Sequence, residues 1–321
     1  MIVPGTHPRR AVPPAGASAR PGPRGSLVGR MARFVGRNWA RLGYAYHVEP
    51  TWLAVNRLTL PVRDLPAALA GVRVAQLSDF HFGPHIPTGY LEEAVERTAV
   101  EKPDLIALTG DFIDRGPAHV AAAARLFRGL KAPLGVFAVL GNHDFSVHTA
   151  RGARRHPELD RRVAGALATE GVTVLRNRSV PVEHNGTKLL VAGIDDLWSG
   201  ESNPDAALGG TCEKTPRVVL AHNPQSVEQF AAHRTDVVLS GHTHGGQINV
   251  PRFGRLLLGK SARRWAAGVY PLETGYLYVN TGVGFGWRFR FGVRPELAVL
   301  TLGTSDSASG CVSEETESSG G

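Results

Sequence analysis

Five short groups of Asp, His and Asn side chains each follow an apolar run of the 321-residue chain. The groups are Ser78-Asp79-Phe80-His81, Gly110-Asp111-Phe112-Ile113-Asp114, Gly141-Asn142-His143-Asp144, His222-Asn223-Pro224 and Gly241-His242-Thr243-His244. Carboxylate, imidazole and amide groups bind divalent metal ions, and the first two also transfer protons in catalysis. Each group alone is more typical of a turn than of a site. Five of them in one chain favour a shared metal centre.

The apolar runs before these groups have the length and composition of buried strands. We expect strands over 72–77, 104–109, 135–140, 172–176, 188–194, 217–221, 236–240, 276–280 and 296–302, and helices over 88–101, 117–130, 157–170 and 224–232. This alternation predicts an α/β domain whose strands are buried on both faces. Ligands of such sheets bind just beyond the carboxyl ends of the strands, so the five groups should meet at one edge.

The ordered groups D-x-H, G-D-x-x-D, G-N-H-D, A-H-N-P and G-H-T-H resemble the calcineurin-like metallophosphoesterase superfamily over about residues 48–302. The segments 46–52 (YHVEPTW) and 293–296 (VRPE) are similar to its YkuE/YaeI-like branch of bacterial phosphodiesterases, which are commonly associated with the membrane or cell envelope. The resemblance implies a metal-dependent phosphoester hydrolase. It also implies a four-layer α/β/β/α sandwich of two mixed sheets, with the site where the strand ends of both sheets meet.

The same resemblance implies two divalent metal ions, which would be Mn, Fe or Zn. The implied ligands of the first ion are Asp79, His81, Asp111 and His244. The implied ligands of the second ion are Asp111, Asn142, His222 and His242. A bridging carboxylate agrees with the need for a shared anion between two closely spaced cations. A water between the ions would be acidified and would attack phosphorus in line.

His143 is expected to act as a general acid toward the leaving alkoxide, because Asn142 beside it occupies the ligand position. Asp144 is expected to orient His143, and Asp114 to orient a ligand histidine.

For three other polar residues the sequence supports only general expectations about their roles. His148 is expected to be an ordinary loop histidine. Arg288 and Arg290 alternate with aromatic residues, which is compatible with phosphate binding and equally with an amphipathic strand.

The positive charge of the chain is concentrated at its N-terminus. Residues 1–47 carry eight arginines and no acidic residue, and the Pro-, Gly- and Arg-rich segment 1–25 is expected to be a disordered basic arm. Residues 26–47 predict a basic amphipathic helix whose apolar face ends near Gly43. Such a helix binds an anionic membrane surface through residues 26–42, or it packs on the domain. Residues 303–321 are expected to be a disordered acidic tail after the catalytic domain, 48–302.

Composition argues against several classes of protein and partner. No apolar run approaches the ~18 residues of a membrane-spanning helix, and two cysteines cannot form a disulfide scaffold. Most of the net positive charge lies in residues 1–47 and not on the folded body, which argues against nucleic acid as a partner, and no protein partner is indicated.

We therefore expect a cytoplasmic enzyme, peripheral on the inner face of the membrane, that hydrolyses a phosphodiester or pyrophosphate. A lipid-linked substrate such as a UDP-diacylglucosamine-type molecule would fit that location. The alternatives are a soluble nucleotide or nucleic-acid phosphodiesterase and a non-catalytic metal-binding scaffold.

Overall fold

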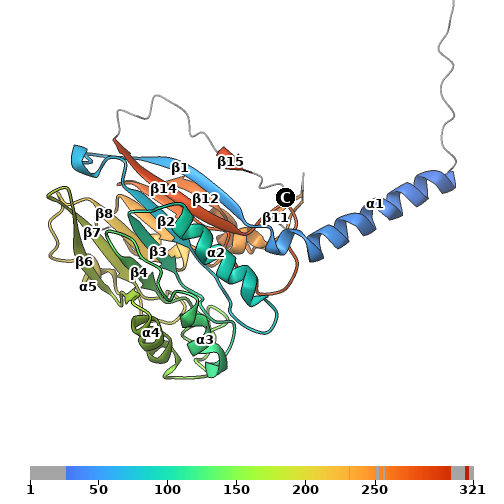
Figure 1. Ribbon diagram of the computed structural model, residues 1–321, viewed down its shortest axis with the longest axis horizontal. Coiled ribbons are helices and arrows are strands. Elements are labelled where there is room, and N and C mark those ends of the chain that lie inside the picture. The colour runs from blue at the N-terminus through green and yellow to red at the C-terminus, as the bar shows by residue number, and fades with distance from the viewer. Residues whose placement is uncertain (1–26, 231, 251–252, 256, 305–314, 318–321) are drawn as a thin grey trace, which may run out of the picture. The chain divides into compact units, whose positions relative to one another are not determined.

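The computed structural model describes residues 27–230, 232–250, 253–255, 257–304 and 315–317 (Figure 1). The chain divides into two compact units, residues 1–42 and 43–321. Helix α1 (Leu27–His47) begins in the first unit and ends in the second. The expected arm, residues 1–25, lies outside the described residues. None of the described helices is both long enough and apolar enough to cross a membrane.

Helix α1 agrees with the helix expected over 26–47, but it continues through Gly43, so this glycine does not end it. Tertiary contacts hold the additional turn in place. Ala45 is fully buried, and the ring of Tyr44 packs edge-on against Trp52 with the centroids 6.4 Å apart. Packing of this kind outweighs the weak preference of glycine for a helix end.

Two mixed sheets form the second unit. The first sheet contains, in spatial order, β15 (Glu315–Glu317), β1 (Ala54–Val62), β14 (Glu296–Thr304), β2 (Arg73–Leu77), β3 (Leu105–Thr109), β4 (Val136–Val139) and β5 (Thr173–Val174). The second contains β12 (Gly268–Pro271), β13 (Tyr276–Val279), β9 (Val237–Ser240), β8 (Arg217–Ala221), β7 (Thr187–Ile194) and β6 (Arg178–His184). Strands β10 (Asn249–Val250) and β11 (Gly254–Arg255) form a separate hairpin.

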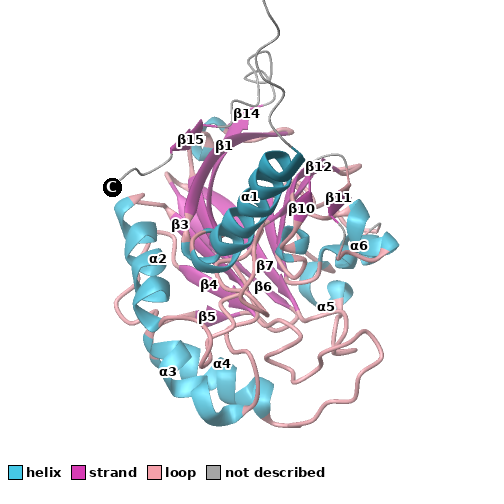
Figure 2. Cartoon of the chain, turned by 90° about the vertical axis from the view of Figure 1, so that its right-hand side faces the viewer, coloured by secondary structure: helices cyan, strands magenta, loops and turns pink. Residues whose placement is uncertain are grey.

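Helices cover the outer face of each sheet. The α-helices of this unit are α2 (Thr88–Val100), α3 (Val120–Arg125), α4 (Leu159–Thr169), α5 (Pro204–Leu208) and α6 (Lys260–Arg264). The short 3₁₀ turns are η1 (Glu49–Thr51), η2 (Ala67–Leu69), η3 (Pro117–His119), η4 (Pro224–Gln229) and η5 (His244–Gly246). Figure 2 shows α2, α3 and α4 on one side of the strands and α5 and α6 on the other.

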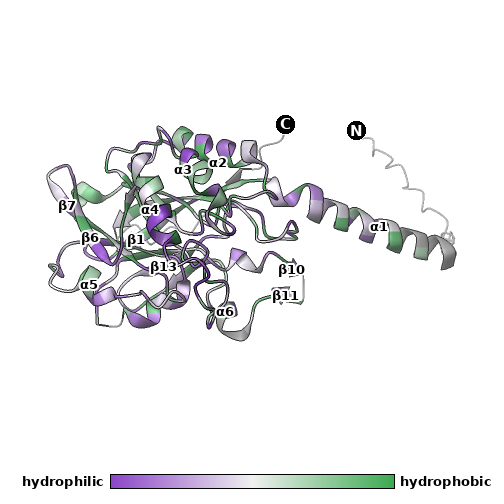
Figure 3. Ribbon diagram, turned by 90° about the horizontal axis from the view of Figure 1, so that it is seen from below, coloured by the Kyte–Doolittle hydropathy of each residue, from purple (hydrophilic) through white to green (hydrophobic). Residues whose placement is uncertain are grey.

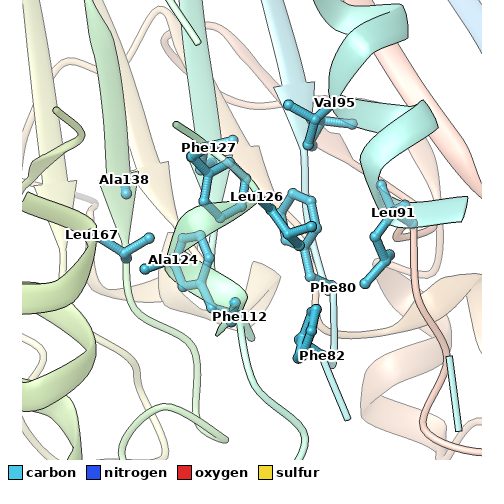
Figure 4. Packing of buried hydrophobic residues seen from close by; sticks show 14 of the residues in the cluster. Phe80, Phe82, Leu91, Val95, Phe112, Ala124, Leu126, Phe127, Ala138 and Leu167 are labelled. Carbon is cyan, nitrogen blue, oxygen red and sulfur yellow. The ribbon is translucent and has the colours of Figure 1, made fainter. Parts of the chain in front are cut away.

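Successive strand residues point into different apolar layers, as the pleat requires. In β2, Ala75 packs toward α2, α3 and α4, whereas Val74 packs against the second sheet. In β8, Val219 packs in the cluster that includes α5. Figure 4 shows the outer layer of the first sheet, where Phe80 packs edge-on against Phe127 at 4.9 Å. The expected α/β/β/α sandwich of two mixed sheets is confirmed.

The first and last long strands of the domain are neighbours. β1 pairs in parallel with β14 from Ala54 opposite Glu296 to Val62 opposite Thr304. β14 also pairs with β2, in the antiparallel direction. It therefore lies between β1 and β2, the first two strands along the chain.

All nine expected strands are present, but two further expectations were wrong. The helix expected over 224–232 is the 3₁₀ turn η4, which starts at a proline after the Asn223 cap. The acidic tail is not wholly without structure, because Gly303 and Thr304 extend β14 and Glu315–Glu317 pair antiparallel with the open edge of β1. Residues 305–314 and 318–321 lie outside the described residues.

Candidate metal centre

All seven expected ligands lie directly after the carboxyl ends of strands. Asp79 and His81 follow β2, Asp111 follows β3, and Asn142 lies shortly after β4. In the second sheet, His222 follows β8, and the remaining two ligands, His242 and His244, follow β9. A buried amide joins the sheets at this edge: Gln76 Nε2 donates to Thr109 Oγ1 at 2.9 Å and to the carbonyl oxygen of Ser240 at 2.9 Å.

One group of donor atoms consists of Asp79, His81 and His244. His81 Nε2 lies 2.9 Å from His244 Nε2, and His244 Nε2 lies 3.3 Å from Asp79 Oδ1. Their three ligand atoms lie within 4.8 Å of one another, and all three residues are buried or nearly so. These side chains can therefore hold a metal ion.

A second group consists of Asp111, His222 and His242. His222 Nε2 lies 3.3 Å from Asp111 Oδ2 and 3.2 Å from His242 Nδ1. Asn142 Oδ1 lies 2.9 Å from the same His242 nitrogen. The amide oxygen of Asn142 therefore joins this group of donors.

Asp111 lies between the two groups. Its Oδ2 is 3.3 Å from His222 Nε2 and 3.6 Å from His81 Nε2, which belong to different groups. The Asp111 carboxylate is thus within reach of a cation in either group.

Backbone hydrogen bonds fix the orientation of the donors. The Nδ1 atom of His222 lies 2.7 Å from the carbonyl oxygen of Thr109, which favours a proton on Nδ1 and a free lone pair on Nε2. The amide of His242 donates to both Asp79 oxygens at 3.0 Å, and the amide of His143 donates to Asp111 Oδ1 at 2.9 Å.

Five of the seven expected ligands have left-handed backbone conformations. Their φ angles are Asp79 54°, His81 44°, Asp111 53°, His242 69° and His244 49°. A residue with a side chain adopts this region at a cost of about 1–3 kcal/mol, and such residues cluster at functional sites. The turns after β2, β3 and β9 thus hold the donors in place at the expense of local stability.

Two glycines permit the close approach of these turns. Gly110 has φ 91°, and a Cβ there would lie 2.6 Å from the amide nitrogen of Gly141 and 2.8 Å from His222 Nδ1. A Cβ at Gly241 would overlap the Ser78 side chain and the Asp79 carboxylate. Only glycine leaves room for the donors at these positions.

The electrostatics of the site also suit a cation. Burial lowers the pKa of His81 and of His242 to about 3, so both imidazoles are neutral and keep a lone pair for a metal. Burial would also lower the pKa of His222, but the Asp111 carboxylate more than offsets this and raises it well above its ordinary value. Burial would raise the pKa of Asp111, yet His222 holds it well below its usual range. A proton shared by this pair occupies the position that a metal ion would take.

His143 lies at the pocket, but its expected partner does not contact its ring. Asp144 is fully buried and accepts hydrogen bonds from the backbone amides of Phe112, Ile113 and Gly141 at 3.0, 3.3 and 2.9 Å. The His143 Nδ1 atom instead lies 2.6 Å from the carbonyl oxygen of Asp114. The prediction that Asp144 orients His143 is therefore wrong. Asp144 fixes the turns that carry Asp111 and Asn142, and Asp114 positions His143 rather than a ligand histidine.

The donors open into a pocket of about 340 Å³. Two residues outside the expected site contribute to its wall, and one of them, His148, was expected to be an ordinary loop histidine. The ring of His148 lies edge-on to that of His143 at 4.6 Å, and the ring of Trp198 lies edge-on to that of His242 at 4.4 Å. The sequence signal that could have placed His148 at the site is its position only four residues after the G-N-H-D group.

Arg288 and Arg290 do not line this pocket. Arg290 is fully buried and donates to the carbonyl oxygens of Thr281, Gly282 and Gly284 at 2.8, 3.1 and 2.6 Å. It supports the turn behind His244. Arg288 donates to the carbonyl oxygen of Tyr46 at 3.1 Å.

Residues 72–246 match the family described as "Calcineurin-like phosphoesterase", and this segment contains every donor described above. The chain belongs to this family. It is a metallophosphoesterase, a hydrolase of phosphoester bonds. The family expected from the ordered groups of polar residues is confirmed.

Named relatives resemble this phosphoesterase over most of their length. YkuE of Bacillus subtilis, an uncharacterized metallophosphoesterase, is 30% identical and covers 81% of this chain and 89% of its own. Phosphodiesterase YaeI of Escherichia coli is 31% identical over 81% of this chain and 92% of its own. UDP-2,3-diacylglucosamine pyrophosphatase LpxG of Chlamydia trachomatis is 29% identical over 80% of this chain and 91% of its own.

Proposed function

We propose that this phosphoesterase hydrolyses a phosphodiester or pyrophosphate with two divalent cations. The observation that carries the proposal is the position of Asp111 Oδ2, 3.3 Å from His222 Nε2 in one donor group and 3.6 Å from His81 Nε2 in the other. One cation would be held by Asp79, His81, Asp111 and His244, the other by Asp111, Asn142, His222 and His242. Oxygen and imidazole donors without thiolate suit Mn²⁺, Fe²⁺ or Zn²⁺.

When bound, such cations supply Lewis-acid stabilisation of phosphate oxygens and acidify water near neutral pH. The protein side chains would supply proton transfer and orientation. His143 is partly exposed at the pocket, and its Nδ1 is occupied by the Asp114 carbonyl. Its Nε2 is therefore the atom that would donate a proton to the leaving alkoxide.

The substrate we propose is lipid-linked. YaeI is named a phosphodiesterase, and LpxG is named a pyrophosphatase of UDP-2,3-diacylglucosamine, a molecule with acyl chains. Both relatives match about four fifths of this chain, which supports a diester or pyrophosphate of an amphiphile rather than a phosphomonoester.

An activity screen tests the proposed chemistry. Protein stripped with a chelator would be assayed on bis-p-nitrophenyl phosphate, p-nitrophenyl phosphate and a UDP-linked glycolipid before and after Mn²⁺, Fe²⁺ or Zn²⁺ is added. We expect metal-dependent hydrolysis of diester and glycolipid, with about two ions bound per chain. Absence of bound metal together with absence of activity under every condition would favour a non-catalytic scaffold.

We also propose that α1 binds an anionic membrane surface on the inner face of the cytoplasmic membrane. Met31, Val35, Trp39 and Leu42 recur at helical spacing and are exposed. Arg37 and Arg41 lie on the opposite side of the helix, and Figure 3 shows the alternation of polar and apolar segments along α1. Aromatic and aliphatic side chains opposite arginines are typical of helices that lie in the lipid interface.

Vesicle flotation tests this location. The intact protein should float with vesicles containing phosphatidylglycerol and not with neutral vesicles, and Trp39→Ser with Leu42→Ser should abolish flotation. Val100→Ser, an exposed apolar residue outside α1, is the matched control. Equal flotation of all three proteins would contradict a role for α1.

A further inference from the structure

A second hollow lies beside the metal pocket. It has a volume of about 690 Å³, and its walls include Tyr46, His85, Gly286, Trp287, Arg288 and Phe289. Tyr46 is near the end of α1, and 286–289 is a loop before the last strand of the domain. The hollow is about twice as large as the metal pocket, and neither the metal donors nor His143 contribute to its wall.

The two hollows adjoin at one residue, and hydrogen bonds connect their walls. Gly286 lines both of them. Gln247, in the turn that carries His244, donates from Nε2 to the carbonyl oxygens of Trp287 and Phe289 at 3.0 and 2.8 Å. The Gly286 amide donates to Gln247 Oε1 at 3.3 Å. The wall of the second hollow is therefore fixed to the loop of a candidate ligand.

Aromatic rings dominate this wall. The rings of Trp287 and Phe289 are stacked with their centroids 5.5 Å apart and their planes 7° from parallel, yet 49% of Trp287 is exposed. The guanidinium of Arg288 lies 5.6 Å over the ring of Tyr46, and its Nε bonds the carbonyl oxygen of that residue. The side-chain amide of Gln247 and the Nε atom of Arg288 are thus already bonded to backbone atoms.

We infer that this aromatic groove binds the apolar chain of a phosphoester whose phosphate occupies the metal pocket. The inference rests on the proposed function, and it names the residues that would recognise the proposed lipid-linked substrate. Ring and other apolar surface makes up most of this concave wall. Such a wall favours an alkyl chain over a nucleobase, which needs donors and acceptors placed for its recognition. The aromatic residues would then determine the preference for amphiphilic esters.

The test compares two diesters that share a leaving group. Octyl p-nitrophenyl phosphate and methyl p-nitrophenyl phosphate would be assayed with the metal-loaded protein, and the ratio of their kcat/KM values would be measured for wild type, Trp287→Ala and Phe289→Ala. We expect the octyl preference to fall at least about tenfold in each variant, mainly through KM. Val100→Ala, which removes an exposed apolar side chain elsewhere, should leave the ratio unchanged.

A binding measurement separates failure of this inference from failure of the proposed chemistry. Octyl phosphate would be titrated calorimetrically into each protein, which needs no turnover. Tighter binding of octyl than of methyl phosphate by wild type, lost in Trp287→Ala, supports the groove even if no ester is hydrolysed. An unchanged octyl preference in both variants would overturn the inference. So would a selective loss of p-nitrophenyl thymidine phosphate hydrolysis in the two variants, because the groove would then be a base-stacking site.

Discussion

The Asp111 carboxylate lies within reach of both donor groups, so its substitution should affect both. We predict that Asp111→Asn lowers kcat at least about 10³-fold and weakens binding of both ions, because the bridging negative charge is removed. Metal analysis after dialysis and steady-state kinetics on bis-p-nitrophenyl phosphate measure this. Asp205→Asn, at an exposed carboxylate paired with His233, is the charge-matched control. Loss of only one ion would show that Asp111 does not bridge.

His143 should differ from the ligands in its effect. We predict that His143→Ala retains the metal content and slows turnover by about 10²–10⁴-fold, as loss of a general acid does. A leaving group that needs no proton should restore much of the rate. A ring nitrogen of His143 lies within 4.8 Å of ligand atoms of His81 and Asp111. Loss of bound metal in His143→Ala would therefore identify His143 as a ligand instead.

At the residue level, the sequence predicted the types of donor but not all their partners. The seven expected ligands come together because each follows the carboxyl end of a strand. The partner of His143 was not predictable, because the choice between the Asp144 side chain and the Asp114 carbonyl depends on the path of two turns. The left-handed backbone at five donors was likewise not predictable, because Asp and His are enriched in that region but most of them adopt other conformations.

The turns after the strands tolerate little added volume. We predict that Gly241→Ala lowers the free energy of unfolding by about 1–3 kcal/mol and reduces metal affinity, because its Cβ would displace Ser78 and Asp79. Denaturant titration and metal analysis measure the two effects. Gly165→Ala is the control, since its Cβ in helix α4 would meet no atom within 4 Å and should stabilise the protein by about 0.5–1 kcal/mol.

The turn 281–284 depends on a buried guanidinium. We predict that Arg290→Met lowers the free energy of unfolding by about 3 kcal/mol, because buried carbonyls of this turn lose their charged donor. Denaturant titration beside Arg125→Met, an exposed arginine of α3, measures the loss. Equal stability of the two variants would mean that the carbonyls find other donors.

Most elements were predictable, and the misses have physical causes. The nine expected strands are apolar runs because both faces of each sheet are buried. β1 was missed because Asn56, Arg57 and Pro61 interrupt its apolar pattern. Several side chains of β1 are partly exposed, so this strand need not be apolar at every position. The helix expected at 224–232 is only a 3₁₀ turn, a distinction that side-chain type does not encode.

For the whole molecule, bound metal and folding should be coupled. The left-handed donors and the buried charged pair of Asp111 and His222 destabilise a metal-free domain. An ion that binds only the folded state stabilises it by mass action, about 2.7 kcal/mol at a hundredfold excess over Kd. We predict that chelation lowers the Tm by several degrees and that Mn²⁺ restores it. Scanning calorimetry measures this, and a Tm indifferent to chelator would contradict it.

The position of β14 has a consequence for biosynthesis. During translation β1 leaves the ribosome early, but its neighbour in the sheet is made about 240 residues later. Until then β1 has no partner on either edge and β2 has one unpaired edge, and such edges invite association with other chains. The enzyme can therefore complete its core only after β14 has been made, and a chain terminated before β14 should require chaperones or be degraded.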